Sequence, residues 1–397
     1  MNKPYLIWKN PRQAIYMIML VLMFIGCINV FSASFVVARD MHGNGFFYLI
    51  RYALFGMLGL AGIKVVEHVG YKKLLNSRFL IGTYIIVFLL LIWVDVAGVA
   101  TKGAQRWIYL GPFSIQPSEC AKLVVIMFTA CKLGPMLKRG EQISLWNGAG
   151  LQGVLAAFLY FVMVMMQPDM GTAAIIMSLA ICIYIIAGIS LSIVWGILGA
   201  GALAAVALVL HSPYRLDRIK VWLDPWIDPQ NNGYQMVQSL TSIGSGGLKG
   251  LGWGLGSGKF FYIPEAHTDF AFAIFCQECG FIGAVLLITL FAVLGGAFFR
   301  VVRQAREERG FLLAAGVTLL IIGQAAANMA MVCGLLPVIG VPLIFISYGG
   351  SSMFVSMLAI GLLLSVYDEE VKAARLEQQP PEARRGTFRV IERRGWE

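Results

Sequence analysis

Residues 14–37 read AIYMIMLVLMFIGCINVFSASFVV, an apolar run long enough to cross the hydrocarbon core of a membrane as a helix. Similar runs recur along the 397 residues, of which 58% are hydrophobic and 13% are charged. An average soluble domain has about 25% charged residues, so this composition excludes an ordinary soluble protein. The sequence therefore predicts an all-α polytopic membrane protein.

The length and composition of the apolar runs predict ten transmembrane helices. They lie near residues 14–37, 46–66, 79–97, 119–135, 149–167, 169–187, 189–210, 270–299, 311–333 and 344–367. Residues 14–367 are thus expected to form one ten-helix domain between an N-terminal segment, 1–13, and a tail, 368–397. The tail is charged and poor in apolar residues, so we expect it to be disordered.

The distribution of Lys and Arg predicts which side of the membrane each segment faces. The two terminal segments and the loops at 64–78, 132–139 and 300–309 hold 21 of the 31 basic residues. Because basic loops favour the cytoplasm, both termini are expected to be cytoplasmic, and the polar interval 211–269 is expected to be a large outer loop between helices seven and eight. This asymmetry, with attraction to anionic membrane lipid, accounts for the net charge of +10 without a nucleic-acid partner.

Charged residues near the outer ends of the spans are the first candidates for a site. Arg106 and Trp107 lie in the loop before the fourth span, and Glu119 and Lys122 lie in the first turns of that span. An ammonium near the bilayer centre costs roughly 3 kcal/mol unless it is paired. Lys122 can pair with Glu119 at i, i+3, or both can belong to a pocket for an anionic ligand. Asp169 follows in a very short turn, whose tight geometry alone can account for it, and membership of a site is the less favoured alternative.

The first part of the large loop has two features that allow more than one interpretation. At helical spacing, Arg215, Arg218 and Trp222 share a face, which is typical of an interfacial helix that either anchors in headgroups or binds phosphates. Asp224 and Asp228 each precede a proline. Turn formation is the favoured role of these two residues, and ligation of a divalent cation is the alternative.

A glycine-rich segment, 244–258, occupies the middle of the loop, and eight of its fifteen residues are Gly. Successive backbone amides in such a segment can form an anion-binding nest for pyrophosphate. The segment can also be a pliable re-entrant stretch with no ligand. It matches no P-loop and no dinucleotide-binding fingerprint, so the sequence leaves both interpretations open.

The loop ends in YIPEAHTDF, in which the position of Asp269 matters more than the pattern. A helix over 269–299 would be about 45 Å long, against roughly 30 Å for the hydrocarbon core. Asp269 is therefore expected to begin this helix at or above the outer interface, within reach of a lipid headgroup. Asp269 or Thr268 can cap the helix. Alternatively Asp269, flanked by His267 and Glu265, can act as a general base.

At these residues the chain resembles a known family. In order and spacing, the sequence from residue 14 to 367 resembles the SEDS family of bacterial cell-wall glycosyltransferases (FtsW, RodA and SpoVE). The motifs that carry the resemblance are GAQRW, QPSECAKL, QPDMGTA, GYQMVQSLTSIGSGGLKGLG, PEAHTDFAFAIFCQECGFIG and GLLPVIGVPLIFISYGGSS. The resemblance implies a ten-helix peptidoglycan polymerase of the bacterial cytoplasmic membrane. It joins lipid II units on the outer face and works with a class B penicillin-binding protein and other division or elongation membrane proteins.

The resemblance also implies roles for individual residues. Asp269 matches the essential carboxylate of the family's HTDF motif, and its expected role is to deprotonate the GlcNAc 4-hydroxyl of one lipid-linked disaccharide. Residues that match positions lining the family's outward cavity are Arg106, Trp107, Glu119, Lys122 and Asp169. The candidates for stabilising pyrophosphate charge are Arg106, Lys122, Arg215 and Arg218. The only cofactor left open is a divalent cation, Mg²⁺ or Mn²⁺.

The chain departs from the family pattern at two places. Gln277-Glu278 stands where members commonly have two adjacent Glu, and Ile344 stands where the family has a second Pro, so we expect a less kinked start to the last helix. The WLDPWIDP and PEAHTDF stretches favour the division and sporulation type, FtsW or SpoVE, over a RodA-like elongation type. The alternatives from other classes are a lipid II flippase and a non-catalytic scaffold that activates a penicillin-binding protein.

Overall fold

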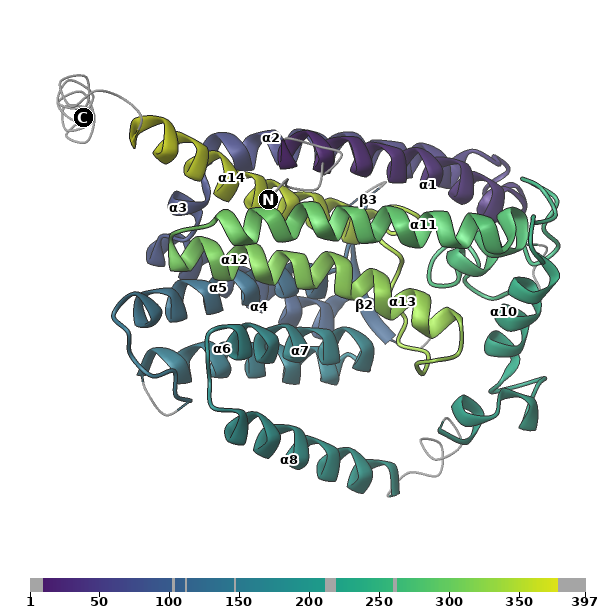
Figure 1. Ribbon diagram of the computed structural model, residues 1–397. Helices are drawn as coiled ribbons and strands as arrows, with labels where there is room; N and C mark the ends of the chain where they lie inside the picture. The colour runs from purple at the N-terminus through teal and green to yellow at the C-terminus, as the bar shows by residue number, and fades with distance from the viewer. Residues whose placement is uncertain are drawn as a thin grey trace, which may run out of the picture.

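The computed structural model of the protein describes residues 10–101, 104–110, 113–145, 148–210, 219–259 and 263–377. These residues form a bundle of long, roughly aligned helices (Figure 1). The long helices are α1 (Pro11–His42), α2 (Phe47–Val69), α4 (Ser77–Ala97), α5 (Pro117–Lys138), α6 (Gly148–Met166), α7 (Met170–Ile186), α8 (Leu191–Leu210), α11 (Ala271–Gln304), α12 (Glu308–Thr318), α13 (Gln324–Val332) and α14 (Gly350–Glu377). The short ones are α3 (Tyr71–Leu74), α10 (Tyr234–Ser245) and the 3-10 turn η1 (Pro225–Ile227).

The polytopic architecture predicted from the sequence is confirmed. Eight of the described helical segments are long and apolar enough to cross a membrane, when α12 and α13 are counted as one segment joined by the π-helical turn η2 (Leu319–Gly323). Two further helices are apolar: α7, which has 17 residues, and α8, of which the stretch Leu191–Leu203 is counted by the same criteria. Each of the ten predicted spans therefore coincides with an apolar helix, and the number that crosses the membrane stays a prediction.

Several helix ends differ from the predicted spans, and each difference has a local cause. The first helix starts at Pro11, because the Asn10 side chain accepts a hydrogen bond from the Arg12 N–H (3.0 Å) and proline suits the first helical position. The last helix continues to Glu377, so the beginning of the predicted disordered tail is helical. Good helix formers and an i, i+3 pair between Glu369 and Lys372 (3.0 Å) extend it. Residues 1–9 and 378–397 lie outside the described residues.

The expectation of an all-α chain was incomplete. A small antiparallel sheet with strand order β1-β2-β3 joins α4 to α5; its strands are β1 (Val99–Thr101), β2 (Ala104–Leu110) and β3 (Phe113–Ile115). The register pairs Val99 with Trp107 and Ile108 with Ile115. Branched and aromatic residues dominate the paired positions, and they favour strands. The three strands are too short for their alternation to stand out in the sequence beside the apolar spans.

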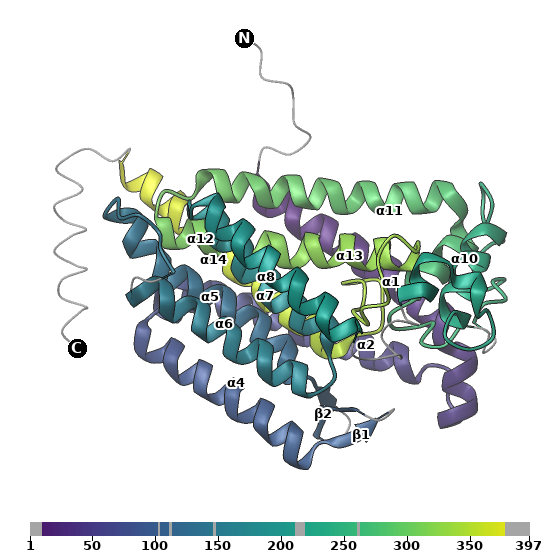
Figure 2. The same cartoon turned by 90° about the horizontal axis from the view of Figure 1, so that it is seen from below.

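The core of the bundle forms around α14 and α5. Of the most apolar 18-residue stretch of each helix, 83% of the residues are buried in α14 and 72% in α5, whereas only 22% are buried in α4. The last helix packs along α2, α1 packs along α11, and α12 packs against α5 (Figures 1 and 2). Peripheral helices such as α4 and α8 expose apolar side chains, which is typical of lipid-facing surfaces.

The glycine-rich segment 244–258 packs against a break in α11. At Gly280 the helix has φ 68° and ψ −170°, a conformation that interrupts the helical hydrogen bonds and suits glycine alone. The loop replaces the lost partners with four backbone hydrogen bonds: Leu251 N to Gln277 O (3.0 Å), Gly252 N to Glu278 O (2.9 Å), Phe281 N to Gly247 O (2.9 Å) and Ile282 N to Leu248 O (3.2 Å). The geometry thus favours a structural use of this segment, since two of its amides already donate to α11 carbonyls.

A buried ion pair also joins α11 to the segment before it. Glu278 Oε1 accepts hydrogen bonds from Lys259 Nζ (3.2 Å) and from Ser32 Oγ of α1 (2.6 Å). Both charged side chains are almost fully buried, so each needs the other in the apolar interior. The partner of Glu278 is therefore Lys259, a residue that precedes α11 in the chain.

Candidate functional site

Asp269 lies in a turn that precedes α11. The residues 263–270, called here the HTDF turn, reverse the chain around Glu265, whose carbonyl accepts hydrogen bonds from Thr268 N (3.1 Å) and Phe270 N (3.3 Å). The helix begins at Ala271 with Phe270 as its N-cap and no side-chain cap. The predictions that Asp269 begins the helix and that Asp269 or Thr268 caps it were wrong, because the Thr268 hydroxyl donates to Glu265 Oε2 instead (2.8 Å).

The segment that joins α13 to α14, residues 333–349, holds the HTDF turn. Tyr348 N donates to His267 O (2.8 Å), and the half-buried Asp269 carboxylate lies against Gly340, where a β-carbon would be 3.6 Å from Oδ2. The tenth span therefore starts at Gly350 rather than at residue 344. The predicted difference at Ile344 falls in this non-helical segment, next to Phe345, whose φ is +67°.

Aromatic rings cover the other side of the turn. The His267 ring lies 4.6 Å from the Tyr48 ring and 5.9 Å from the Tyr348 ring, and these two tyrosines meet edge to face at 4.9 Å. Glu265, on the same turn, has a positive φ of 56°, which is uncommon for a residue with a side chain. His267 and Glu265 thus lie on the same turn as Asp269, with the His267 ring against the two tyrosines and the Glu265 carboxylate bound to the Thr268 hydroxyl.

Glu119 and Lys122 form the pair that their spacing allowed. Lys122 Nζ donates to Glu119 Oε1 (2.8 Å) and to Gln324 Oε1 of α13 (2.7 Å), and the Lys122 side chain is only 1% exposed. Gln324 Nε2 in turn donates to Pro342 O in the 333–349 segment (3.3 Å). The geometry supports the pairing interpretation, while a direct role of either residue in substrate binding stays a prediction.

Arg106 and Asp169 meet at the start of α7. The Arg106 guanidinium donates to Gln167 O (3.1 Å) and Pro168 O, and its Nη1 lies 3.9 Å from Asp169 Oδ1. Asp169 caps α7 by accepting a hydrogen bond from Thr172 N (3.2 Å), and this contact supports a structural role for Asp169 in the turn. Trp107, the neighbour of Arg106 on β2, is partly buried and pairs with Val99.

The 333–349 segment connects these groups. Gly171, two residues after Asp169, packs against Ile339 O so closely that a β-carbon there would overlap it. Ile339 is followed by Gly340, which contacts Asp269. The carbonyls of the next two residues, 341–342, accept hydrogen bonds from two amide side chains of α13, and one of these, Gln324, also accepts from Lys122. The segments that carry Asp169 and Asp269, and helix α13, whose Gln324 binds Lys122, therefore converge on four consecutive residues of one connection.

Other predicted residues are not part of this convergence. Arg215 and Arg218 lie outside the described residues. Asp224 accepts from Trp226 N (3.1 Å), and Asp228 accepts from Asn231 Nδ2 (3.0 Å) and Asn232 N (3.1 Å), so both stabilise turns. Among the residues that the structure describes, no group of three or more His, Cys, Asp or Glu side chains could hold a metal ion. A requirement for Mg²⁺ or Mn²⁺ stays a prediction.

Three buried amide side chains near Asp269 were not among the residues predicted for the site. Asn29 of α1 and Asn328 of α13 are both 0% exposed, and Gln324 is 2% exposed. Each binds the 333–349 segment, and Asn29 and Asn328 also bind the backbone around Asp269. The available signal was the presence of uncharged amides inside otherwise apolar spans, with Gln324 and Asn328 four residues apart on one helix face.

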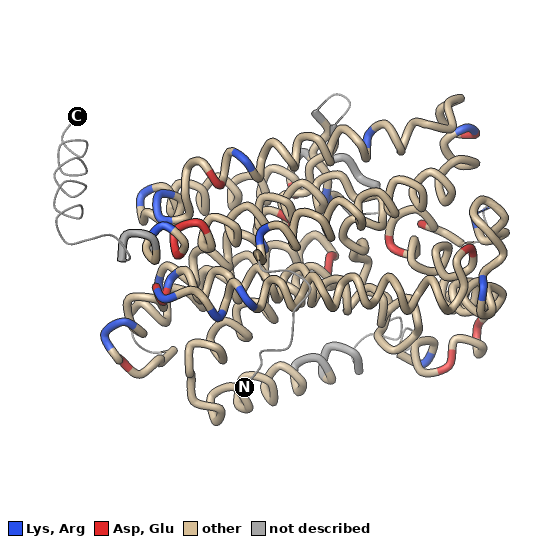
Figure 3. The backbone as a smooth tube through the Cα atoms, turned by 45° about the horizontal axis from the view of Figure 1, so that its top comes forward, with Lys and Arg blue, Asp and Glu red and all other residues tan. Residues whose placement is uncertain are grey.

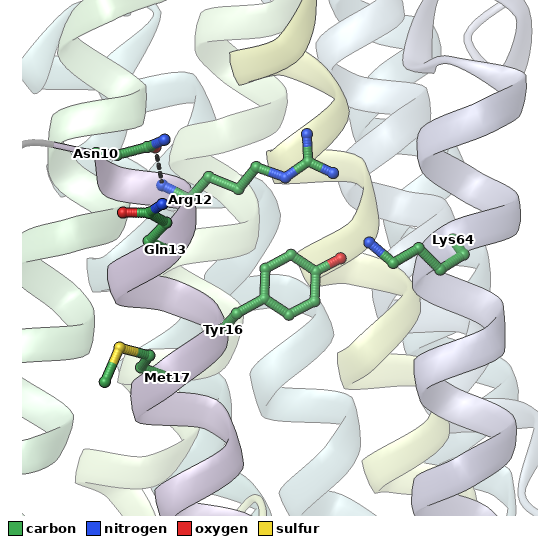
Figure 4. Close-up of a pocket in the computed structure, with 6 residues that line it drawn as sticks. All are labelled: Asn10, Arg12, Gln13, Tyr16, Met17 and Lys64. Carbon is green, nitrogen blue, oxygen red and sulfur yellow. Dashed lines mark hydrogen bonds between the residues drawn. The ribbon is translucent and has the colours of Figure 1, made fainter.

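An open depression of about 820 Å³ lies at the start of α1, well away from Asp269 along the bundle, and Figure 4 shows its lining. The lining residues are Asn10, Arg12, Gln13, Tyr16, Met17 and Lys64. Arg12 is already bound to Asp368 (2.8 Å) and to Glu67 (3.0 Å), and Lys64 is bound to Glu67 (3.2 Å). These cations are neutralised, so the depression is not the candidate site.

The fold and the site together define a polytopic helical membrane protein with a half-buried carboxylate where several helices and one connection meet. The sequence matches the cell cycle protein family of FtsW, RodA and SpoVE over residues 12–372. The chain belongs to this family, as its motifs predicted.

Known relatives agree with this assignment. The chain is 39% identical to the "Probable peptidoglycan glycosyltransferase FtsW" of Geobacter sp. (strain M18), over 89% of this chain and 95% of that protein. It is 36% identical to the stage V sporulation protein E of Bacillus subtilis (strain 168), over 90% and 97%. A solved chain from a peptidoglycan synthase complex aligns with a TM-score of 0.73 and 25% identity, over 90% and 97%. The Thermus thermophilus rod shape determining protein RodA shares the fold, with a TM-score of 0.66 and 24% identity over 90% and 96%.

Proposed function

We propose that the protein is a peptidoglycan glycosyltransferase that polymerises lipid II, with Asp269 as the general base. The observation that carries the proposal is the placement of the Asp269 carboxylate. It lies in a turn held against the 333–349 connection, which also contacts the segment of Asp169 and, through Gln324, is linked to Lys122. Relatives that share more than a third of the sequence over nearly the whole chain are named peptidoglycan glycosyltransferases, which supports the same activity here.

The proposed reaction forms one glycosidic bond for each lipid II added. Asp269 takes the proton of the GlcNAc 4-hydroxyl of one lipid-linked disaccharide, and the oxygen attacks the anomeric carbon of MurNAc in another. The bond from that carbon to the pyrophosphate oxygen breaks, the configuration inverts, and undecaprenyl pyrophosphate leaves with the electron pair. Arg106, whose side chain is 30% exposed, is our candidate for contacting the developing pyrophosphate charge.

The proposed orientation places both termini in the cytoplasm and Asp269 at the outer face. Lys and Arg gather at the end of the bundle from which α14 leads to the C-terminus (Figure 3). That end includes Lys72, which lies 3.3 Å from Glu307 in the turn before α12. Because basic residues favour the cytoplasmic side, this distribution supports an outer location for the opposite end, where the large loop and the HTDF turn lie.

The proposed partner is a class B penicillin-binding protein, and the proposed setting is cell division or sporulation. The similar solved chain belongs to a synthase complex described as coordinating polymerization and crosslinking, which supports a crosslinking partner. Relatives named FtsW and stage V sporulation protein E support this setting over a RodA-like role in elongation.

The test is polymerisation of labelled lipid II by the purified protein with its penicillin-binding partner. Wild type is expected to make glycan chains, and Asp269→Asn is expected to make none, because the amide cannot accept the proton. Glu141→Gln is the matched control, because it also removes a carboxylate, here from an exposed position after α5. This variant should be fully active. Equal products from wild type and Asp269→Asn would exclude Asp269 as the base.

The same preparation separates the alternatives. Translocation of lipid II across liposomes without polymerisation would favour a flippase, and activation of the partner by Asp269→Asn would favour a scaffold. Addition of a chelator tests the predicted divalent cation.

A further inference from the structure

Two buried asparagines hold the backbone on both sides of Asp269 in the same way. Asn328 Nδ2 donates to Asp269 O (2.8 Å) and to Val341 O (2.6 Å). Asn29 Nδ2 donates to Ala271 O (3.1 Å) and to Ile346 O (3.3 Å). Each amide therefore bridges the entry to α11 and the 333–349 segment, one from α13 and the other from α1.

The ties to the HTDF turn follow a regular pattern along its backbone. The carbonyls of His267, Asp269 and Ala271, two residues apart, accept from Tyr348 N, Asn328 Nδ2 and Asn29 Nδ2 respectively. The peptide unit that follows Asp269 is tied directly, and the units that follow His267 and Ala271 are tied on either side of it, so a reorientation of this backbone requires at least one of these hydrogen bonds to break. The tied backbone fixes the direction in which the carboxylate leaves the turn.

The chemistry of the two sites requires a side chain with two N–H donors on one atom. An apolar side chain of the same size would leave two buried carbonyls without a donor in each case. Within the part of the chain that the structure describes, the Oδ1 atoms of Asn29 and Asn328 have no hydrogen-bond partner. Each amide thus contributes only its N–H donors, and its buried oxygen is left unpaired at a cost in free energy. The two asparagines are therefore needed for these hydrogen bonds, since an apolar side chain could fill the space without that cost.

The helix that supplies Asn328 is itself fixed at the neighbouring turn. Gln324, four residues earlier on the same face of α13, donates to Pro342 O (3.3 Å) and accepts from Lys122. Consecutive residues 341–342 are therefore bound by two amides from one helix face, and this attachment prevents Asn328 from moving independently of the segment it bridges.

We propose that Asn29 and Asn328 are positioning residues that set the place of the Asp269 carboxylate relative to the sugar hydroxyl. This inference rests on the proposed function, in which Asp269 is the general base. A displacement of a catalytic group by about 1 Å costs on the order of 100-fold in rate. Asn328 has the larger role, because it binds the carbonyl of Asp269 itself, whereas Asn29 binds the carbonyl two residues later.

The experiment compares Asn328→Leu and Asn29→Leu with Ser239→Ala in the full-length protein with its partner. Ser239→Ala is the matched control, because Ser239 Oγ donates a buried hydrogen bond to Val332 O at the end of the same α13 (2.8 Å) without contact to the HTDF turn. Two quantities are measured: polymerisation kinetics with lipid II, and hydrogen–deuterium exchange of peptides that cover residues 263–272 and 341–348.

Asn328→Leu is expected to lower kcat on the order of 100-fold with KM changed less than about twofold, because substrate contacts remain while the base is misplaced. Asn29→Leu should lower kcat less. Both should speed exchange in the two measured peptides, and Ser239→Ala should change neither quantity. Lost kcat in folded protein, with exchange that is faster in the two measured peptides and unchanged in the remaining peptides, separates positioning from general damage.

Each outcome has a definite meaning. Unchanged exchange in Asn328→Leu overturns the inference, whatever the activity. Faster exchange with normal kcat shows that the amides hold the turn without positioning the base, and also overturns it. An inactive wild type refutes the proposed function instead, and the exchange data still decide whether the two amides hold the turn.

Discussion

Gly340 lies against the carboxylate of Asp269, and a β-carbon on Gly340 would be 3.6 Å from Asp269 Oδ2. The backbone at Gly340 has φ +65°, a conformation that residues with side chains adopt only with strain. Glycine is therefore favoured here by its backbone conformation, and an added β-carbon would come into van der Waals contact with the carboxylate.

Gly340→Ala is expected to lower polymerisation about tenfold or more, since a methyl group would contact one carboxylate oxygen and exclude water or a sugar hydroxyl from it. The backbone strain should cost about 1 kcal/mol of stability. The measurement is the rate of glycan formation, together with thermal unfolding in detergent.

Gly334→Ala is the control for the backbone strain. Gly334 lies in the same segment with φ +80°, and its nearest neighbour for an added β-carbon is the Met236 sulfur at 3.6 Å. It should lose similar stability and keep its activity. If the two variants lose activity equally, the contact with Asp269 has no special role.

The sequence predicted the main architecture because the membrane imposes strong length and polarity rules on each span. Spacing alone gave the Glu119–Lys122 pair as one of two interpretations, and the sequence placed Asp269 within two residues of the start of α11. The 333–349 segment overlaps one of the family motifs, but its role could not be predicted. Its contacts with Asp269, Gly171 and α13 join residues that are far apart in the chain. The partners of Asn29 and Asn328 depend on the same distant contacts and could not be read from local pattern.

Removal of one member of the buried pair should destabilise the protein. Lys122→Met leaves Glu119, which is 3% exposed, without its cation, and a broken buried pair costs about 3–5 kcal/mol. The double change Glu119→Gln and Lys122→Met should recover most of that loss, since no unpaired charge remains. Thermal unfolding of both variants and wild type in the same detergent measures the difference.

A different result would identify Lys122 as a ligand for substrate. In that case Lys122→Met would raise KM for lipid II while thermal stability stayed near that of wild type, and the double variant would not recover activity. The kinetic and thermal measurements on the same samples therefore distinguish a structural pair from a pyrophosphate site.

Replacement of Arg106 by lysine tests the geometry at the start of α7. The planar guanidinium donates to Gln167 O and Pro168 O while it faces Asp169, and a lysine cannot satisfy both carbonyls. We expect Arg106→Lys to lower kcat/KM about tenfold, with a stability change below about 1 kcal/mol because the side chain is partly exposed. Arg139→Lys, an exposed arginine paired with Glu141, should have no effect on activity. Normal activity of Arg106→Lys would show that a positive charge alone suffices there.

Gly280→Ala tests whether the break in α11 supports the site. A β-carbon at Gly280 would overlap the Gly250 amide nitrogen, and φ 68° with ψ −170° is open to glycine almost exclusively. We expect a loss of about 3 kcal/mol or more, measured by thermal unfolding, and faster proteolysis within residues 244–258. Gly296→Ala, in the same helix and with no atom within 4 Å of an added β-carbon, should be neutral or stabilising by up to about 1 kcal/mol. If Gly280→Ala is as stable as Gly296→Ala, the glycine-rich segment does not hold the first turns of α11, and the position of Asp269 must depend on the 333–349 segment and its amide contacts alone.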